Sequence, residues 1–121
     1  MKQRYLLNRE RKEVYCARLT ELLPLVRGRL GMTQEELGMV SGVSRVTISQ
    51  IESGRTKMNW LHFTALMMIC FSERNTKELL YSKGLLDPEL LGFYQVSMRE
   101  PELNVTVPRE SIALWNELTK I

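Results

Sequence analysis

Four side chains that can contact the edges of DNA bases lie close together in SRVTISQIESG, residues 44–54. An arginine can donate to both acceptors of guanine, a glutamine can pair with adenine, and a small apolar group suits the thymine methyl. A serine hydroxyl can bond to a base or to a phosphate. These four candidates for base contact are Arg45, Val46, Ser49 and Gln50.

A helix would bring these four side chains to one side. Ile48 and Ile51 are three residues apart, which is the spacing at which a helix buries one face. If both isoleucines point inward, the candidates turn to the opposite side. A rotation that buried Val46 instead would expose both isoleucines, so we do not expect it. Ser44 and Gly54 are typical of the start and the end of such a helix.

A second short helix is predicted directly before this one, within TQEELGMVSG at 33–42. Thr33 and Glu36 have the spacing of a capping box, in which each side chain bonds to the other residue's backbone amide. Gly42 can adopt the positive φ that ends a helix. Two short helices joined by a tight turn with a glycine form a helix-turn-helix pattern. The residues expected to fill the angle between them are Leu37, Val40, Val43, Ile48 and Ile51.

Apolar residues at helical spacing predict further helices at 13–30, 60–71, 76–83 and from Pro88 onward. Pro24 interrupts the first of these, because proline lacks an amide hydrogen and crowds the preceding turn. We expect a kink there, or a new helix with Pro24 in its first turn. Asn59, Asn75 and Asp87 are the expected N-caps of the later helices.

The pattern changes after residue 84. LNVTV at 103–107 alternates apolar and polar residues, which predicts a strand, and 108–121 has the pattern of an amphipathic helix around Trp115. We therefore predict an all-α domain at 1–84 and a tail at 85–121 that contains a short helix, a strand and a helix.

Positive charge is concentrated in the first half of the chain. Residues 1–57 contain eleven Lys or Arg and six Asp or Glu, a net +5, whereas residues 58–121 have a net charge of −2. This distribution favours a polyanionic partner for the first half. Arg9, Arg11 and Lys12 are expected to form a solvated face, with a backbone-contacting arm as the alternative.

Cysteine and histidine usage excludes the familiar zinc sites, because Cys16, Cys70 and His62 are too few and too widely spaced. Two reduced, half-buried thiols and the lack of a signal peptide or long apolar run favour a cytoplasmic location. No metal, cofactor or membrane is expected, and no small-molecule ligand is evident. The apolar residues of 60–71 are expected in the core rather than in a ligand pocket, namely Trp60, Phe63, Leu66, Met67 and Cys70.

The segment VRGRLGMTQEELGMVSGVSRVTISQIESGRTKM closely resembles the DNA-binding domain of the Cro and phage-repressor type, also called the xenobiotic-response-element family. TQEEL, the turn glycine, TIS and IESG stand in the register of that family, and the resemblance covers roughly residues 22–83. It implies a five-helix domain whose third helix enters the major groove.

The resemblance also assigns roles to individual residues. Arg45, Val46, Ser49 and Gln50 fall at base-facing positions. The positions that contact phosphate in the family correspond to Gln34, Thr47, Ser53, Arg55 and Lys57. Arg27 and Glu52 match a pair that often forms an ion pair with a structural role.

Two residues depart from the family pattern. Gly38 replaces a small alanine in the first helix of the motif, which lowers helix propensity by about 1 kcal/mol. Ser41 stands where a larger apolar residue is common, so that we expect this corner to be less tightly filled.

These observations lead to the hypothesis of a sequence-specific regulator of transcription that binds double-stranded DNA, has no enzymatic activity and acts as a dimeric repressor. One such motif buries little surface, and we expect the tail to join two copies through the strand at 103–107. The alternative is a protein-interaction module, such as an antitoxin-like or adaptor subunit, on the same helical scaffold. An enzyme is disfavoured because no nucleophile, metal site or phosphate loop is assembled.

Overall fold

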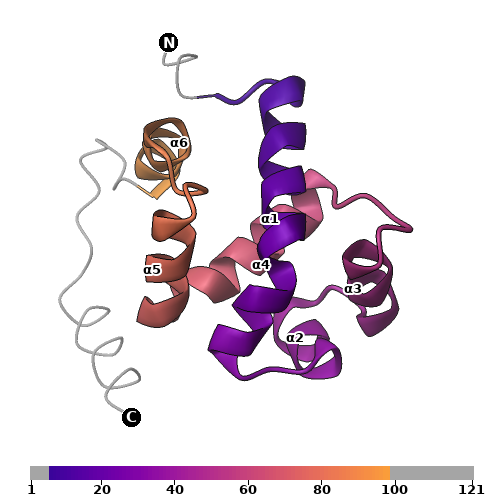
Figure 1. Cartoon of the computed structure of the whole chain (residues 1–121). Coiled ribbons are helices and arrows are strands. Elements are labelled where there is room, and N and C mark those ends of the chain that lie inside the picture. Colours follow the sequence, from indigo (N-terminus) through magenta and orange to yellow (C-terminus); the bar gives the residue numbers. More distant parts are fainter. Residues whose placement is uncertain (1–5, 99–121) are drawn as a thin grey trace, which may run out of the picture.

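The computed structural model describes residues 6–98, and the helices found there confirm the all-α class. The tail predictions for 103–107 and 108–121 lie outside the described residues. The helices are α1 (Arg9–Leu30), α2 (Gln34–Ser41), α3 (Arg45–Glu52), α4 (Trp60–Phe71), α5 (Arg74–Ser82) and α6 (Pro88–Met98). Figure 1 shows α2 and α3 on one side of α1, with α5 and α6 on the other.

Helix α1 is longer than the sequence pattern predicted. It begins after Asn8, whose Oδ1 accepts a hydrogen bond from the Arg11 amide at 2.8 Å, and it ends at Gly31 with φ of 66°. The helix continues through Pro24, so the alternative of a new helix starting there is wrong. Pro24 is exposed, and the long apolar face of α1 packs against the core on both sides of it.

Side-chain caps define the starts of the next three helices as predicted. Thr33 and Glu36 form the capping box of α2, Ser44 caps α3, and Asn59 caps α4 through the His62 amide. The prediction that Asn75 caps α5 is wrong. That helix begins two residues earlier, after Glu73, and has no side-chain cap.

The core forms where α1 and α4 meet the other helices. Leu37, Val43, Ile48 and Ile51 are buried there as predicted, but Val40 is 51% exposed and the prediction for it was wrong. Val40 lies one residue before the end of α2, three residues after the buried Leu37, where the core no longer covers this side of the helix. The fully buried members with the largest side chains include Tyr15, Leu19, Leu23, Phe63, Leu66, Met67 and Leu80.

Residues beyond 84 contribute to the same core. Leu85, Leu86 and Leu90 are buried, and Asp87 caps α6 as predicted by accepting from the Leu90 amide at 2.9 Å. The Tyr15 hydroxyl donates to Asp87 at 2.5 Å, which connects α1 to the start of α6. Across residues 6–98, no helix is both long and apolar enough to cross a membrane.

Candidate nucleic-acid interface

The turn between α2 and α3 is held by local hydrogen bonds and by a close backbone approach. Gly42 has φ of 81°, and the Val43 amide donates to the Ser41 hydroxyl at 3.1 Å. A Cβ added at Gly38 would lie 2.9 Å from the Val43 carbonyl oxygen and 3.2 Å from the Arg45 nitrogen. The two departures from the family pattern thus have structural roles, because Gly38 admits the start of α3 and Ser41 caps the turn.

Helix α3 separates an apolar side from a solvent-facing side. Ile48 and Ile51 have no exposed surface, while Val46 is 62% exposed and Arg45 and Ser49 are exposed as well. These three side chains are therefore available for contact with a partner. Their assignment to bases remains a prediction.

Gln50 is half-buried and is held by the loop that follows α3. Its side-chain Oε1 accepts a hydrogen bond from the Thr56 hydroxyl at 3.2 Å. Its backbone carbonyl accepts from the amides of Arg55 and Thr56 at 2.9 and 3.2 Å. Thr56 was not among the sequence candidates, because nothing in its local pattern indicates that the chain folds back onto Gln50. Because this bond holds the side-chain oxygen of Gln50, it also fixes the direction in which the two amide hydrogens point.

Two hydroxyls predicted to contact phosphate are already engaged within the protein. Thr47 accepts a hydrogen bond from the Ser44 hydroxyl at 2.8 Å, while Ser53 donates to the Gln50 carbonyl at 3.1 Å. Thr47 therefore keeps its own hydroxyl hydrogen for a phosphate oxygen, whereas Ser53 would have to give up its internal bond. The sequence did not distinguish these two cases.

The cations on this side of the molecule are not neutralised by neighbouring carboxylates. Arg45, Arg55 and Lys57 are exposed, and within residues 6–98 none of them takes part in an ion pair. Exposed cations of this kind attract a polyanion without first having to break an internal contact.

Arg27, Gln34 and Glu52 join three helices beneath this surface. The Arg27 guanidinium donates to both carboxylate oxygens of Glu52 at 2.7 and 2.9 Å, and its third nitrogen donates to the Met32 carbonyl at 3.2 Å. The Gln34 amide donates to Glu52 at 3.0 Å. Gln34, a candidate for phosphate contact, is thus held by one of its two amide hydrogens and has the other available.

Burial acts to raise the pKa of the Glu52 carboxyl, but the hydrogen bonds from Arg27 and Gln34 outweigh burial and the pKa is lowered. The same ion pair raises the pKa of Arg27. Glu52 is therefore ionised at neutral pH, and its network with Arg27 and Gln34 stays charged.

Comparison with protein-family models identifies the segment that contains α2 and α3. Residues 25–58 match a protein-family model described as Helix-turn-helix. This segment is a helix-turn-helix of the Cro and phage-repressor type. Neither a curated protein nor a solved structure gives a significant match to the chain.

The helix-turn-helix match extends from Leu25 in the last part of α1 to Met58 before α4. It therefore contains every residue that the sequence predicted for DNA contact, as well as both members of the Arg27–Glu52 ion pair. Helix-turn-helix segments of this type belong to DNA-binding regulators of transcription.

The basic residues at the start of α1 do not act together as one cluster. Arg9 bonds to Glu13, Arg11 forms an ion pair with Glu89 at 2.7 Å, and Lys12 lies over the ring of Trp60. Of these three cations, Lys12 alone has no carboxylate partner within residues 6–98. The side chains of Arg9 and Arg11 are 91% and 37% exposed, as a solvated face requires, and the backbone-contacting arm stays an untested alternative.

Proposed function

We propose that this protein is a sequence-specific regulator that binds double-stranded DNA, has no enzymatic activity and represses transcription as a dimer. The observation that supports this most is the exposed side of α3, where Arg45, Val46 and Ser49 face solvent on a helix whose other side is fully buried. In a helix-turn-helix, the second helix of the motif enters the major groove.

Specificity comes from Arg45 and Gln50 in this proposal. Arg45 is exposed and forms no ion pair with residues 6–98, so that its guanidinium can donate to the O6 and N7 of a guanine. Gln50 has its side-chain oxygen anchored by Thr56, which orients its amide hydrogens. Each good bidentate contact discriminates against a wrong base by about 1–3 kcal/mol. Val46 would contact a thymine methyl, and Ser49 a base edge.

Affinity comes mostly from phosphate contacts. Gln34 begins α2, and helix N-termini favour anions. Arg55 and Lys57 lie in the loop after α3 with exposed side chains. Thr47 and Ser53 would add hydroxyl contacts at the two ends of α3. These groups position the helix without reading the sequence.

Two half-sites are needed because one helix-turn-helix buries too little surface for tight binding. We propose that residues 103–107 and the segment around Trp115 join two copies, since an alternating strand can pair with its twin. Replacing Val105 and Val107 by aspartate and measuring the mass in solution tests this step. If the double variant is still a dimer, the proposal that residues 103–107 join the two copies is wrong.

Salt-dependent binding of a labelled duplex of mixed sequence tests the DNA-binding step. We expect retention at low ionic strength and a steep loss of affinity as salt rises. Lys57→Ala should lower the slope of log K against log salt by about one unit, while Lys77→Ala on α5 should leave it unchanged. Failure to retain any duplex at low ionic strength would defeat the proposal. Co-purification of a stoichiometric protein in that case would favour the interaction module.

A further inference from the structure

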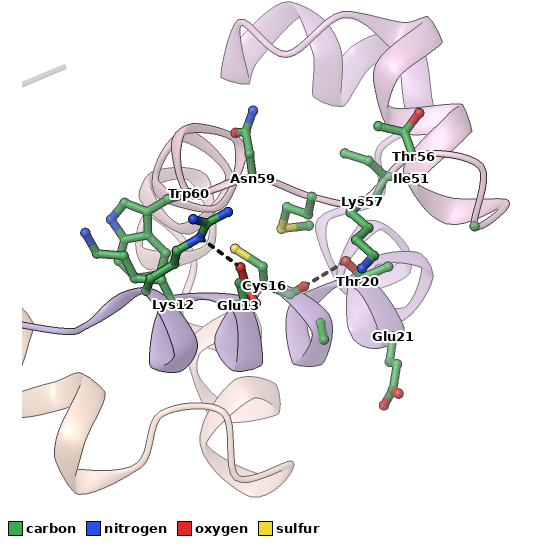
Figure 2. A pocket seen from close by; sticks show the side chains of 14 residues that line it. Lys12, Glu13, Cys16, Thr20, Glu21, Ile51, Thr56, Lys57, Asn59 and Trp60 are labelled. Carbon is green, nitrogen blue, oxygen red and sulfur yellow. Dashed lines mark hydrogen bonds and ion pairs between the residues drawn. The ribbon is translucent and has the colours of Figure 1, made fainter.

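A groove lies between the first half of α1 and the loop that joins α3 to α4 (Figure 2). Its volume is about 670 Å³. Helix α1 contributes Lys12, Cys16 and Thr20, while the loop contributes Thr56 and Lys57. The groove is on the side of α1 that faces the helix-turn-helix, away from α5 and α6.

The floor of the groove is apolar. Cys16 and Met58 are each only 5% exposed, and Ile51 lies beside them. Figure 2 shows the Cys16 sulfur directed toward the loop. Burial, with a smaller contribution from Glu13, raises the pKa of this thiol to about 11, so that the floor is uncharged at neutral pH.

The rim of the groove is positively charged. Lys12 lies at one end, 5.5 Å from the centre of the Trp60 ring, and Lys57 extends toward Thr20 at the other end (Figure 2). Neither lysine is in an ion pair within the described residues. Of the two carboxylates at this rim, Glu13 is bonded to Arg9, and Figure 2 shows Glu21 pointing away from the loop.

We propose that this groove binds a small apolar carboxylate, with the apolar body on the floor and the carboxylate against Lys57, since the Lys12 ammonium already lies over the Trp60 ring. Ligand sites combine a largely apolar concave surface with a few placed polar groups. The carboxylate pairs with the Lys57 ammonium group, and the apolar body covers the floor of Cys16 and Met58. Inorganic phosphate could meet only the first of these requirements.

A ligand in the groove affects two groups of the proposed DNA-binding surface, Lys57 and the Gln50 side chain. This effect on DNA binding rests on the proposed function. Lys57 is both a rim residue and a candidate phosphate contact, so a bound carboxylate competes with DNA for it. Thr56 lines the groove and also donates to the Gln50 side chain. The ligand therefore weakens DNA binding, and DNA weakens ligand binding by the same factor.

Amide chemical shifts of the full-length protein without DNA test the site itself. The probe is decanoate below its critical micelle concentration, and 1-decanol is its uncharged match. We expect saturable shifts confined to residues 12–21 and 54–60 with decanoate, and weaker binding of decanol. Failure to saturate, equal binding of both probes, or shifts centred on the exposed Leu61 and Met68 of α4 would overturn the site.

Variants sharpen this test. Lys57→Ala should weaken decanoate binding about threefold, the size of an exposed ion pair, whereas Lys77→Ala should leave it unchanged. Ala17→Trp places a large ring at an exposed lining position and should abolish binding without disturbing the core. An Ala17→Trp protein that folds and still binds decanoate with full affinity would contradict the assignment.

A duplex-binding assay separates the site from its effect. Decanoate should lower the DNA affinity of the unaltered protein and leave that of Ala17→Trp unchanged. If decanoate binds in the chemical-shift experiment but DNA affinity does not move, the competition is wrong and the regulator assignment is untouched. If no DNA binds at all, the proposed function fails while the chemical-shift result still decides the groove.

Discussion

Arg27 of α1 and Glu52 at the end of α3 are joined by two hydrogen bonds, from Nε to Oε2 at 2.7 Å and from Nη2 to Oε1 at 2.9 Å. Gln34 at the start of α2 donates to the same carboxylate. The side chains of Arg27 and Glu52 are only 22% and 10% exposed. One carboxylate thus fixes the start of the first motif helix relative to the end of the second, which sets the angle at which α3 is presented.

Glu52→Gln should destabilise the protein. The amide cannot neutralise the half-buried Arg27 guanidinium, and removing one partner of a buried ion pair costs about 3–5 kcal/mol, less where some solvent reaches it. We expect the free energy of unfolding in urea to fall by about 2–4 kcal/mol. Glu35→Gln, on the exposed side of α2, is the control and should change it little. Equal effects of both substitutions would show that the ion pair does not stabilise the fold.

Stability should fall in acid as Glu52 and Asp87 take up protons. The pKa of each is lowered on folding: burial opposes this, but Arg27 and Gln34 outweigh it at Glu52, and the bonds from Tyr15, the Leu90 amide and Arg18 outweigh it at Asp87. Their contribution is therefore complete above the ordinary values of 4.5 and 3.8 and is lost as the pH falls through the lower folded values. Urea midpoints measured from neutral to acid pH should decline in this range. The decline should be smaller in Glu52→Gln, and an unchanged decline would contradict this origin.

Gly38→Ala should destabilise the protein although alanine favours helices. The new methyl would approach the Val43 carbonyl oxygen to 2.9 Å, and that oxygen belongs to backbone that cannot move without shifting α3. Strain of about 1–3 kcal/mol outweighs the gain of about 1 kcal/mol in helix propensity. Gly28→Ala in α1 is the matched control, because nothing lies within 4 Å of its added Cβ. It should raise the melting temperature, whereas Gly38→Ala should lower it. A rise in both would refute the close approach.

Tyr15→Phe should weaken the attachment of α6 to α1. The hydroxyl of this fully buried residue donates toward Asp87 at 2.5 Å and toward Glu89 at 3.0 Å. Losing a donor to a carboxylate costs about 1.5–3 kcal/mol, which we expect in the free energy of unfolding. Tyr81→Phe is the control, since that ring is 65% exposed. Hydrogen exchange in α6 should quicken only in Tyr15→Phe, and unaltered exchange there would contradict the proposed attachment.

Features encoded by neighbouring residues could be predicted from the sequence. The capping box of Thr33, the caps Ser44 and Asn59, and the inward side of α3 follow from spacings of three residues, over which a helix repeats its faces. The Asn75 cap failed because Glu73, two residues earlier, already starts that helix. The prediction that Val40 is buried was wrong because apolar spacing identifies the side of a helix that faces the core, but not how far neighbouring elements cover each residue on that side.

Contacts between distant segments could not be predicted. Tyr15 and Asp87 are seventy-two residues apart, and no local pattern indicates that their side chains meet. The bond from Thr56 to Gln50 depends on how the loop after α3 folds back, and the groove requires two segments with no shared periodicity. No ligand was evident from the sequence for the same reason. The helical pattern predicts Trp60 in the core, and it does not indicate that this residue also lines a groove.

Selection of bound sequences from a random pool of duplexes tests the central claim most directly. The unaltered protein should select a palindromic consensus whose half-sites are about 34 Å apart, one turn of the double helix. Arg45→Ala and Gln50→Ala should each lose preference at one position in every half-site, while Lys57→Ala keeps the consensus at lower affinity. No consensus, or the same consensus with Arg45→Ala and Gln50→Ala as with the unaltered protein, would contradict the assignment of α3 as the helix that reads DNA.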